Sequence, residues 1–438
     1  METERNAAWR PLLGGRLAER AAAVIDDIAG ELAATRRAIG TGADAYPARV
    51  LGRPHLGTGS SGPALFFAYL DPARPGGGAL DEAVGYLELA VDQLGRQPAH
   101  PILYDGFFGV GWVAEHLKGR AYEPGGEGDD GDPNVELDEL LLAVLAPGWA
   151  GDYDLIRGLV GLGVYALERL PAPPARRALD QVVSQLAERA EERPDGLAWW
   201  TPAELALTVG LRPGRSGHYN LGVAHGAAGT IGFLAHLVEL ELEGERARPL
   251  LEGAVAWFLA QGTGDPAESI FPDAILPGEP PQPTRTAWCY GDAGIAAVLL
   301  RAARAAGRPE WEARACAVAR AVARRPLERM AVIDAGLCHG AAGLGHLFNR
   351  LWQATGDDGF RAAAVAWFER ALAMRRPGDG FAGFRTWTRT QDEVIWREDP
   401  SFLTGAAGIG LALLAATTPV APEWDRVMLL SMPPRRAR

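Results

Sequence analysis

The stretch CHGAAGLGHLFNRLW, residues 338–352, contains the pattern on which the predicted architecture rests. Two glycines, Gly340 and Gly343, are followed by an almost wholly apolar run. The same Gly-x-x-Gly core recurs along the chain, and seven residues are the first glycines of its copies: Gly59, Gly106, Gly158, Gly226, Gly291, Gly340 and Gly405. Neighbouring copies are 47 residues apart at the closest, from Gly59 to Gly106, and 68 at the widest, from Gly158 to Gly226. Each copy therefore has room for two helices and two connections, which indicates a repeat architecture.

The helices predicted from the sequence fall into two kinds. The runs after the glycine pairs are apolar all round and are expected to be buried on every side. Between them lie amphipathic stretches with charges on one face, including residues 17–34, 80–94, 175–193 and 311–325. These are expected to form an outer shell. Strand signals are weak. The sequence therefore predicts an all-α fold, an (α/α) toroid of seven inner and seven outer helices, built as a single domain over residues 1–438.

Composition excludes several classes of function. The chain has 43 Lys and Arg against 55 Asp and Glu, for a net charge of -12. Such a chain repels nucleic acid, and no basic stripe offsets the charge. The apolar runs are too short to span a bilayer. Three cysteines in 438 residues argue against a disulfide framework and for the reducing cytoplasm.

Two of these cysteines lie inside repeat cores. Cys289 and Cys338 precede the first glycine of adjacent copies by the same two residues, and His339 follows Cys338 directly. A toroid brings such positions together. Two thiolates and one imidazole form a zinc site with an open fourth position, which is typical of catalytic zinc. The alternative is that both cysteines are small buried hydrophobic residues. Cys316, inside an amphipathic helix, fits that alternative.

Three further polar residues lie in or near the cores. His225 occupies the position of His339 in another copy, and could be a fourth ligand or an acid/base group, a role that suits its pKa near neutrality. Asp154 could orient or accept a proton, or only cap a helix. Arg285, four residues before Cys289, could hold a developing enolate oxygen, or be a surface charge.

Taken together, these motifs resemble the lanthionine synthetase C-like family, the cyclases of lanthipeptide (lantibiotic) biosynthesis. The resemblance covers all seven repeats. Its most specific parts are NLGVAHG (220–226), WCYG (288–291), GLCHGAAGLGHL (336–347) and DPSFLTGAAGIGLALL (399–414).

The resemblance implies an α/α toroid with one zinc ion, Zn2+, per chain. It implies Cys289, Cys338 and His339 as the metal ligands and His225 as the acid/base group. It also implicates Asp154, Arg285 and Tyr290 at the active site. No departure from the family pattern occurs among these seven positions, which argues against an inactive relative.

The implied reaction closes (methyl)lanthionine rings in a precursor peptide. A separate dehydratase first converts Ser or Thr to dehydroalanine or dehydrobutyrine, and a cysteine thiol of the same peptide then adds to the alkene. The expected partners are the dehydrated precursor with its leader segment, the dehydratase and an exporter. The chain resembles the free-standing cyclases, not the fused synthetases.

Other classes of function stay open at this point. A relative of the same fold could bind glutathione and add thiols to dehydroamino-acid residues. A zinc prenyltransferase would need a basic diphosphate site, which is not found beside the metal ligands. A zinc-free glycosidase would need paired carboxylates, and only Asp154 is well placed. A purely structural scaffold is the last alternative.

Overall fold

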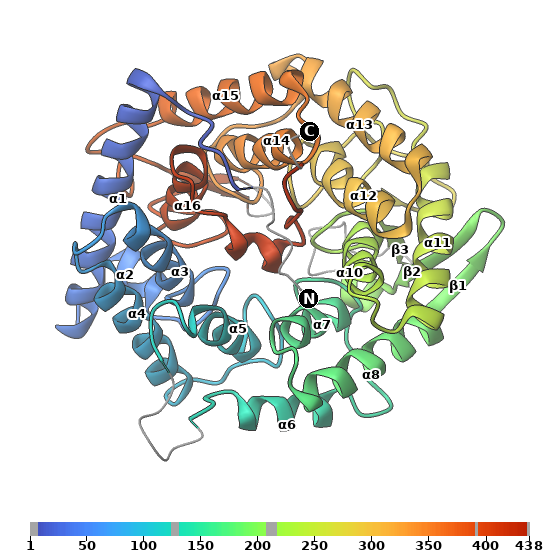
Figure 1. The fold of residues 1–438 in the computed structure, drawn as a ribbon, viewed down its shortest axis with the longest axis horizontal. Helices are drawn as coiled ribbons and strands as arrows, with labels where there is room; N and C mark the ends of the chain where they lie inside the picture. The colour runs from blue at the N-terminus through green and yellow to red at the C-terminus, as the bar shows by residue number, and fades with distance from the viewer. Residues whose placement is uncertain (1–7, 124–130, 207–216, 390–392, 436–438) are drawn as a thin grey trace.

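The computed structural model describes residues 8–123, 131–206, 217–389 and 393–435. Within these residues, seven apolar helices form the inner ring (Figure 1), as predicted. They are α3 (Ser61–Leu70), α5 (Phe107–Leu117), α7 (Leu159–Glu168), α10 (Ala227–Glu239), α12 (Asp292–Ala306), α14 (Ala341–Thr355) and α16 (Ala406–Thr417). Their residues are buried almost throughout.

Seven amphipathic helices surround this ring in the described part of the chain (Figure 1). They are α1 (Gly15–Gly40), α4 (Ala79–Leu94), α6 (Val135–Val144), α8 (Pro173–Arg189), α11 (Gly244–Ala260), α13 (Pro309–Arg324) and α15 (Asp358–Ala373). The all-α toroid of seven inner and seven outer helices is therefore confirmed.

The ring is closed by pairing the two ends of the chain. Each inner helix contacts the next, and α16 contacts α3. The outer partner of α16 is α1, the first helix of the chain. The segment before α1 is tied to the last turns of α16, because the indole of Trp9 donates to Ala415 O at 2.7 Å and Leu12 N donates to Ala416 O at 2.8 Å. The last repeat is thus completed by the N-terminal helix.

The glycine pairs are required by the close approach of the backbone before each inner helix. The loop before each inner helix folds back across the start of that helix. A Cβ at the second glycine would overlap a carbonyl oxygen six residues earlier, as at Gly343 against Leu337 and Gly294 against Trp288. A third glycine, two residues further on, allows close contact with a neighbouring side chain in some copies, as at Gly410 against Phe66. The glycines therefore fix the loops as well as the packing of the ring.

Short strands occur in the structure although strand signals in the sequence are weak. A sheet of order β1-β2-β3-β4 contains β1 (Ala190–Arg193), β2 (Gly196–Thr201), β3 (His218–Asn220) and β4 (Ala274–Ile275). A separate hairpin is formed by β5 (Thr386–Arg389) and β6 (Val394–Arg397). The remaining short elements are α2 (Tyr46–Leu51), α9 (Ala203–Ala206), η1 (Asp71–Ala73), η3 (Leu327–Arg329) and η4 (Glu423–Met428).

The C-terminal segment lies inside the ring, where η4 is visible in Figure 1. Its residue Asp425 is fully buried and binds Arg350 of α14 through two contacts of 2.6 and 2.7 Å, while His346 lies 2.7 Å from the same carboxylate. The indole of Trp288 donates to Met428 O at 3.0 Å. Inner helices and core loops are thereby anchored to one internal segment.

Among the described residues, no helix has the length and apolar character needed to cross a bilayer.

Candidate functional site

The loops before the inner helices are joined at one shared position, two residues before the first glycine of each core. Backbone hydrogen bonds of 2.7 to 3.4 Å link six such positions in series. They run through Tyr104, Gly57, Leu403, Cys338, Cys289 and Ala224. Cys289 and Cys338 are neighbours in this series, with Cys289 N donating to Cys338 O at 3.4 Å. The repeat register is what brings the two thiols together.

His339 completes a group of three potential metal ligands. The ligand atoms of Cys289, Cys338 and His339 all lie within 4.8 Å of one another, and no further His, Cys, Asp or Glu of the described residues belongs to this group. Cys289 is buried, and the other two side chains are partly exposed. Two sulfurs and one imidazole are donors that zinc prefers, and a set of three protein ligands is typical of catalytic zinc.

The two thiols have opposite electrostatic environments. A hydrogen bond from Cys338 lowers the pKa of Cys289 well below its ordinary value, and His339 acts in the same direction although burial opposes it. The same hydrogen bond, together with burial, raises the pKa of Cys338. The contact between the two thiols therefore favours one negative charge shared within the pair. A thiolate is the form that binds a metal.

Behind His339 lies a buried carboxylate that the sequence analysis missed. Asp334 Oδ2 is 3.5 Å from His339 Nε2, and neither atom has a hydrogen-bond partner within the described residues. Burial alone would lower the pKa of His339, but Asp334 and Cys289 raise it to about 9. Metal-binding histidines usually direct their second nitrogen at such a carboxylate. The residues present therefore fit a metal ion.

His225 lies beside this group and is held by Asp154. The two residues come from successive repeats, and His225 Nδ1 is 2.6 Å from Asp154 Oδ2. Asp154 is buried, and its Oδ1 accepts from Arg157 N at 2.7 Å, so the carboxylate is fixed at both oxygens. Burial lowers the pKa of His225, but the hydrogen bond and the charge of Asp154 outweigh burial and raise it. His225 is outside the ligand group.

Tyr290, whose ring contacts His225, and Arg285 line a small cavity of about 70 Å³. The Tyr290 ring stacks on His225 at 6.1 Å between centroids. Its hydroxyl accepts from Asn220 Nδ2 at 3.0 Å, and burial raises its pKa, so the hydroxyl keeps its proton. The Arg285 guanidinium has no ion pair within the described residues and lies 5.6 Å from the Trp387 ring. Arg285 is thus available to bind an oxygen.

Trp387 of strand β5 covers the group from outside the repeat cores. Its ring lies 5.3 Å from that of His339 in an edge-to-face arrangement. Nothing in the repeat pattern identifies Trp387. Asp334 does follow the repeat pattern, because Asn220, Asp334 and Asp399 share one position, six residues before a first glycine.

The structure thus brings Cys289, Cys338, His339, His225, Asp154, Arg285 and Tyr290 to one region. Asp154 is not the cap of its helix, because Gly158 holds that position in α7. Cys316 lies apart, in α13, where burial raises its pKa.

Comparisons with known proteins identify the family and the fold of this chain. The sequence matches the family model described as lanthionine synthetase C-like protein over residues 52–429. Among solved structures the chain is similar to nisin cyclase, with 18% sequence identity and a TM-score of 0.66. The match covers 90% of this chain and 96% of that chain. At this identity the likeness shows a shared fold.

Proposed function

The chain belongs to the lanthionine synthetase C-like family, and from this premise we propose that it is a zinc-dependent lanthipeptide cyclase. It adds a cysteine thiol of a precursor peptide to dehydroalanine or dehydrobutyrine of the same peptide, giving lanthionine or methyllanthionine. The observation that carries the proposal is the Cys289, Cys338 and His339 group lying beside the His225–Asp154 pair.

Cys289, Cys338 and His339 would hold one zinc ion. We assign His339 Nδ1 to the metal, because Nε2 is directed at Asp334. When bound, zinc lowers the pKa of a thiol that joins it. The thiolates of Cys289 and Cys338 would offset part of the positive charge of that ion.

His225 is the proposed proton donor. The thiolate of the peptide attacks the β-carbon, a C–S bond forms, and the alkene electrons pass to the α-carbon and its carbonyl oxygen. Because Nδ1 of His225 is bound to Asp154, Nε2 is the nitrogen free to give a proton to the α-carbon. The raised pKa of His225 keeps that proton available near neutral pH.

Arg285 and Tyr290 are the proposed ligands of the enolate oxygen. The guanidinium of Arg285 has no competing ion pair in the described part of the chain. The Tyr290 hydroxyl already accepts from Asn220, so its own hydrogen is free to be donated. Donors aimed at a developing negative charge stabilise the transition state more than the ground state.

The proposed partners follow from this reaction. A separate dehydratase supplies the dehydrated precursor peptide with its leader segment, and an exporter removes the product. We propose the cytoplasm as the place of reaction, because thiols stay reduced there.

Metal analysis of the purified chain tests the zinc centre. Wild type is expected to contain about one zinc per chain, and Cys289→Ala and Cys338→Ala to lose it. Cys316→Ala is the matched control, since Cys316 is the remaining cysteine and lies in α13. Zinc retained in both site variants, or lost equally in the control, would overturn the assignment.

Activity is tested separately with a dehydrated precursor peptide. Ring closure leaves the mass unchanged but removes a free thiol, so the cyclised product resists alkylation. His225→Ala is expected to keep zinc and to lose ring closure. If His225→Ala sheds the metal, His225 is a ligand and not the proton donor. If wild type adds glutathione but closes no ring, the alternative thiol-adding activity replaces the cyclase.

A further inference from the structure

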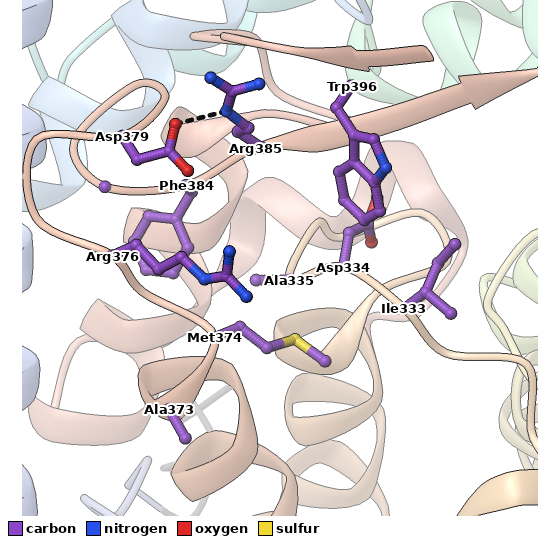
Figure 2. A pocket seen from close by; sticks show the side chains of 11 residues that line it. Ile333, Asp334, Ala335, Ala373, Met374, Arg376, Asp379, Phe384, Arg385 and Trp396 are labelled. Carbon is purple, nitrogen blue, oxygen red and sulfur yellow. Dashed lines mark hydrogen bonds and ion pairs between the residues drawn. The ribbon is translucent and has the colours of Figure 1, made fainter. Parts of the chain in front are cut away.

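A second cavity has a volume of about 470 Å³, and Figure 2 shows the side chains that line it. Its walls come from the loop before α14, the C-terminal end of α15 with the loop that follows, and strand β6. Asp334 lines this cavity and also faces His339, so the cavity and the metal-binding group share one loop. The volume is in the range of ligand pockets. The proposed mechanism does not use this cavity.

One arginine in the cavity carries an uncompensated charge. Figure 2 shows the Arg376 side chain extending into the cavity toward Ala335, and its guanidinium has no ion pair or hydrogen bond within the described residues. Arg385 is different, because its Nε lies 2.6 Å from Asp379. The charge of Asp334 is directed at His339. In a chain with a net charge of -12, a free cation in a cavity favours an anionic group of a ligand.

The cavity also has exposed apolar walls. Ile333 and Trp396 line it and are 48% and 43% exposed, and Val394 is exposed two residues before Trp396 on the same strand. Large hydrophobic side chains gathered at an exposed site often mark a binding surface. Figure 2 shows the Trp396 indole on the side of Asp334 and Ile333, with Met374 and Arg376 facing it.

The hairpin connects this cavity with the metal-binding group. Trp396 of β6 is directly paired with Trp387 of β5, so both indoles lie on one face of the hairpin. Trp387 covers His339, and Trp396 lines the cavity. A peptide bound along this face would therefore contact both Trp396 at the cavity and Trp387 beside His339.

We propose that this cavity binds a segment of the peptide substrate in which an acidic residue is flanked by apolar residues. The inference rests on the proposed function, because it takes the ligand of the neighbouring group to be a peptide. The carboxylate binds the Arg376 guanidinium in the bidentate manner that suits this pair. The apolar neighbours pack on Trp396 and Ile333. Binding here holds the peptide while its thiol reaches the metal-binding group.

The test uses two fluorescein-labelled decapeptides that differ at one position. One has Glu between Leu and Phe, and the other has Gln there. Neither contains cysteine or a dehydroamino acid, so binding does not depend on thiol chemistry. Affinity for the full-length protein is measured by fluorescence anisotropy, with Arg376→Gln and Trp396→Ala beside wild type. Arg324→Gln is the matched control, because Arg324 is an exposed arginine of α13 outside the cavity and loses the same charge.

Wild type and Arg324→Gln are expected to bind the Glu peptide about tenfold more tightly than the Gln peptide. Gln keeps one acceptor oxygen for Arg376, so the difference is the usual effect of one charge-assisted hydrogen bond. Arg376→Gln should bind the two peptides equally, and Trp396→Ala should weaken both. Equal binding of the two peptides by wild type, unchanged preference in Arg376→Gln, or no measurable binding would overturn the proposal. Cys338→Ala should keep the preference for Glu, so failure of the zinc chemistry and failure of this site are distinguishable.

Discussion

Replacement of Asp334 by Asn is expected to weaken zinc binding although Asp334 is not a ligand. The change removes the negative charge facing His339 Nε2 and places an NH₂ donor there. His339 can satisfy that donor only by moving its proton to Nδ1, the nitrogen assigned to the metal. The turn itself is preserved, because Asp334 uses only Oδ1 to accept from Gly336 N at 3.3 Å, and an Asn amide oxygen can do the same.

The expected loss follows from the contact distance. Loss of a carboxylate behind a metal-binding histidine usually costs about 10- to 100-fold in metal affinity, or about 1.4 to 2.8 kcal/mol. The Nε2–Oδ2 distance of 3.5 Å is longer than an ordinary N–H···O hydrogen bond. We therefore expect the lower half of that range, about 10- to 30-fold.

Zinc affinity is measured by competition with a chromogenic chelator, and the fold is checked by circular dichroism. Asp399→Asn is the control, because Asp399 forms the same turn in the next repeat, accepting from Ser401 N at 2.8 Å. Its second oxygen accepts from the Thr404 hydroxyl at 2.6 Å, and a hydroxyl can equally accept from an amide. Affinity within twofold of wild type in Asp334→Asn, or an equal loss in Asp399→Asn, would refute the reasoning.

Two further variants probe the acid/base pair and the internal segment. Ring closure needs protonated His225, so the rate should fall as pH rises through its pKa. In Asp154→Asn the residue that raises this pKa is gone and burial lowers it, so the fall should move to lower pH in the pH–rate profile; an unchanged profile would contradict the role of Asp154. Asp425→Asn leaves the buried Arg350 without its counter-charge and should reduce the free energy of unfolding by about 3 to 5 kcal/mol in urea denaturation. Glu423→Gln, in the same turn but half exposed, should cost no more than about 1 kcal/mol, and equal losses in the two variants would contradict the argument.

Much of the ring could be predicted because a pair of glycines recurs at the same spacing in every repeat. At Gly343 and Gly294 a side chain would overlap the backbone of the preceding loop, so the pattern reports a steric requirement. Aligning the repeats places Cys289 and Cys338 at the same position of adjacent copies. The closed ring then predicts that the two thiols lie close together. The pairing of α1 with α16 could not be predicted, because α1 is an ordinary amphipathic helix and its sequence does not identify the helix that it contacts.

The residues around the metal-binding group were harder to predict. Trp387 reaches His339 from a hairpin that has no counterpart in the repeat cores, and a β5–β6 pair of four residues each leaves little alternation to detect. Asp334 could have been found by aligning the loops, but an Asp in a loop has an ordinary explanation as a turn residue. Its second oxygen becomes informative only when the distance to His339 is known.

That second atom gives a physical reason why one loop can serve different chemistry in different repeats. In three loops the side chain of Asn220, Asp334 or Asp399 uses Oδ1 to accept from the amide two residues later, at 2.8 to 3.3 Å. The second terminal atom of the side chain, Nδ2 in Asn220 and Oδ2 in the two aspartates, is then held in place but takes no part in the turn. In each case it lies close to a residue that directly precedes a first glycine, and those residues are Tyr290, His339 and Thr404. Because this atom donates in Asn220 and carries negative charge in Asp334, the same turn holds a different kind of neighbour in each repeat while the backbone stays the same.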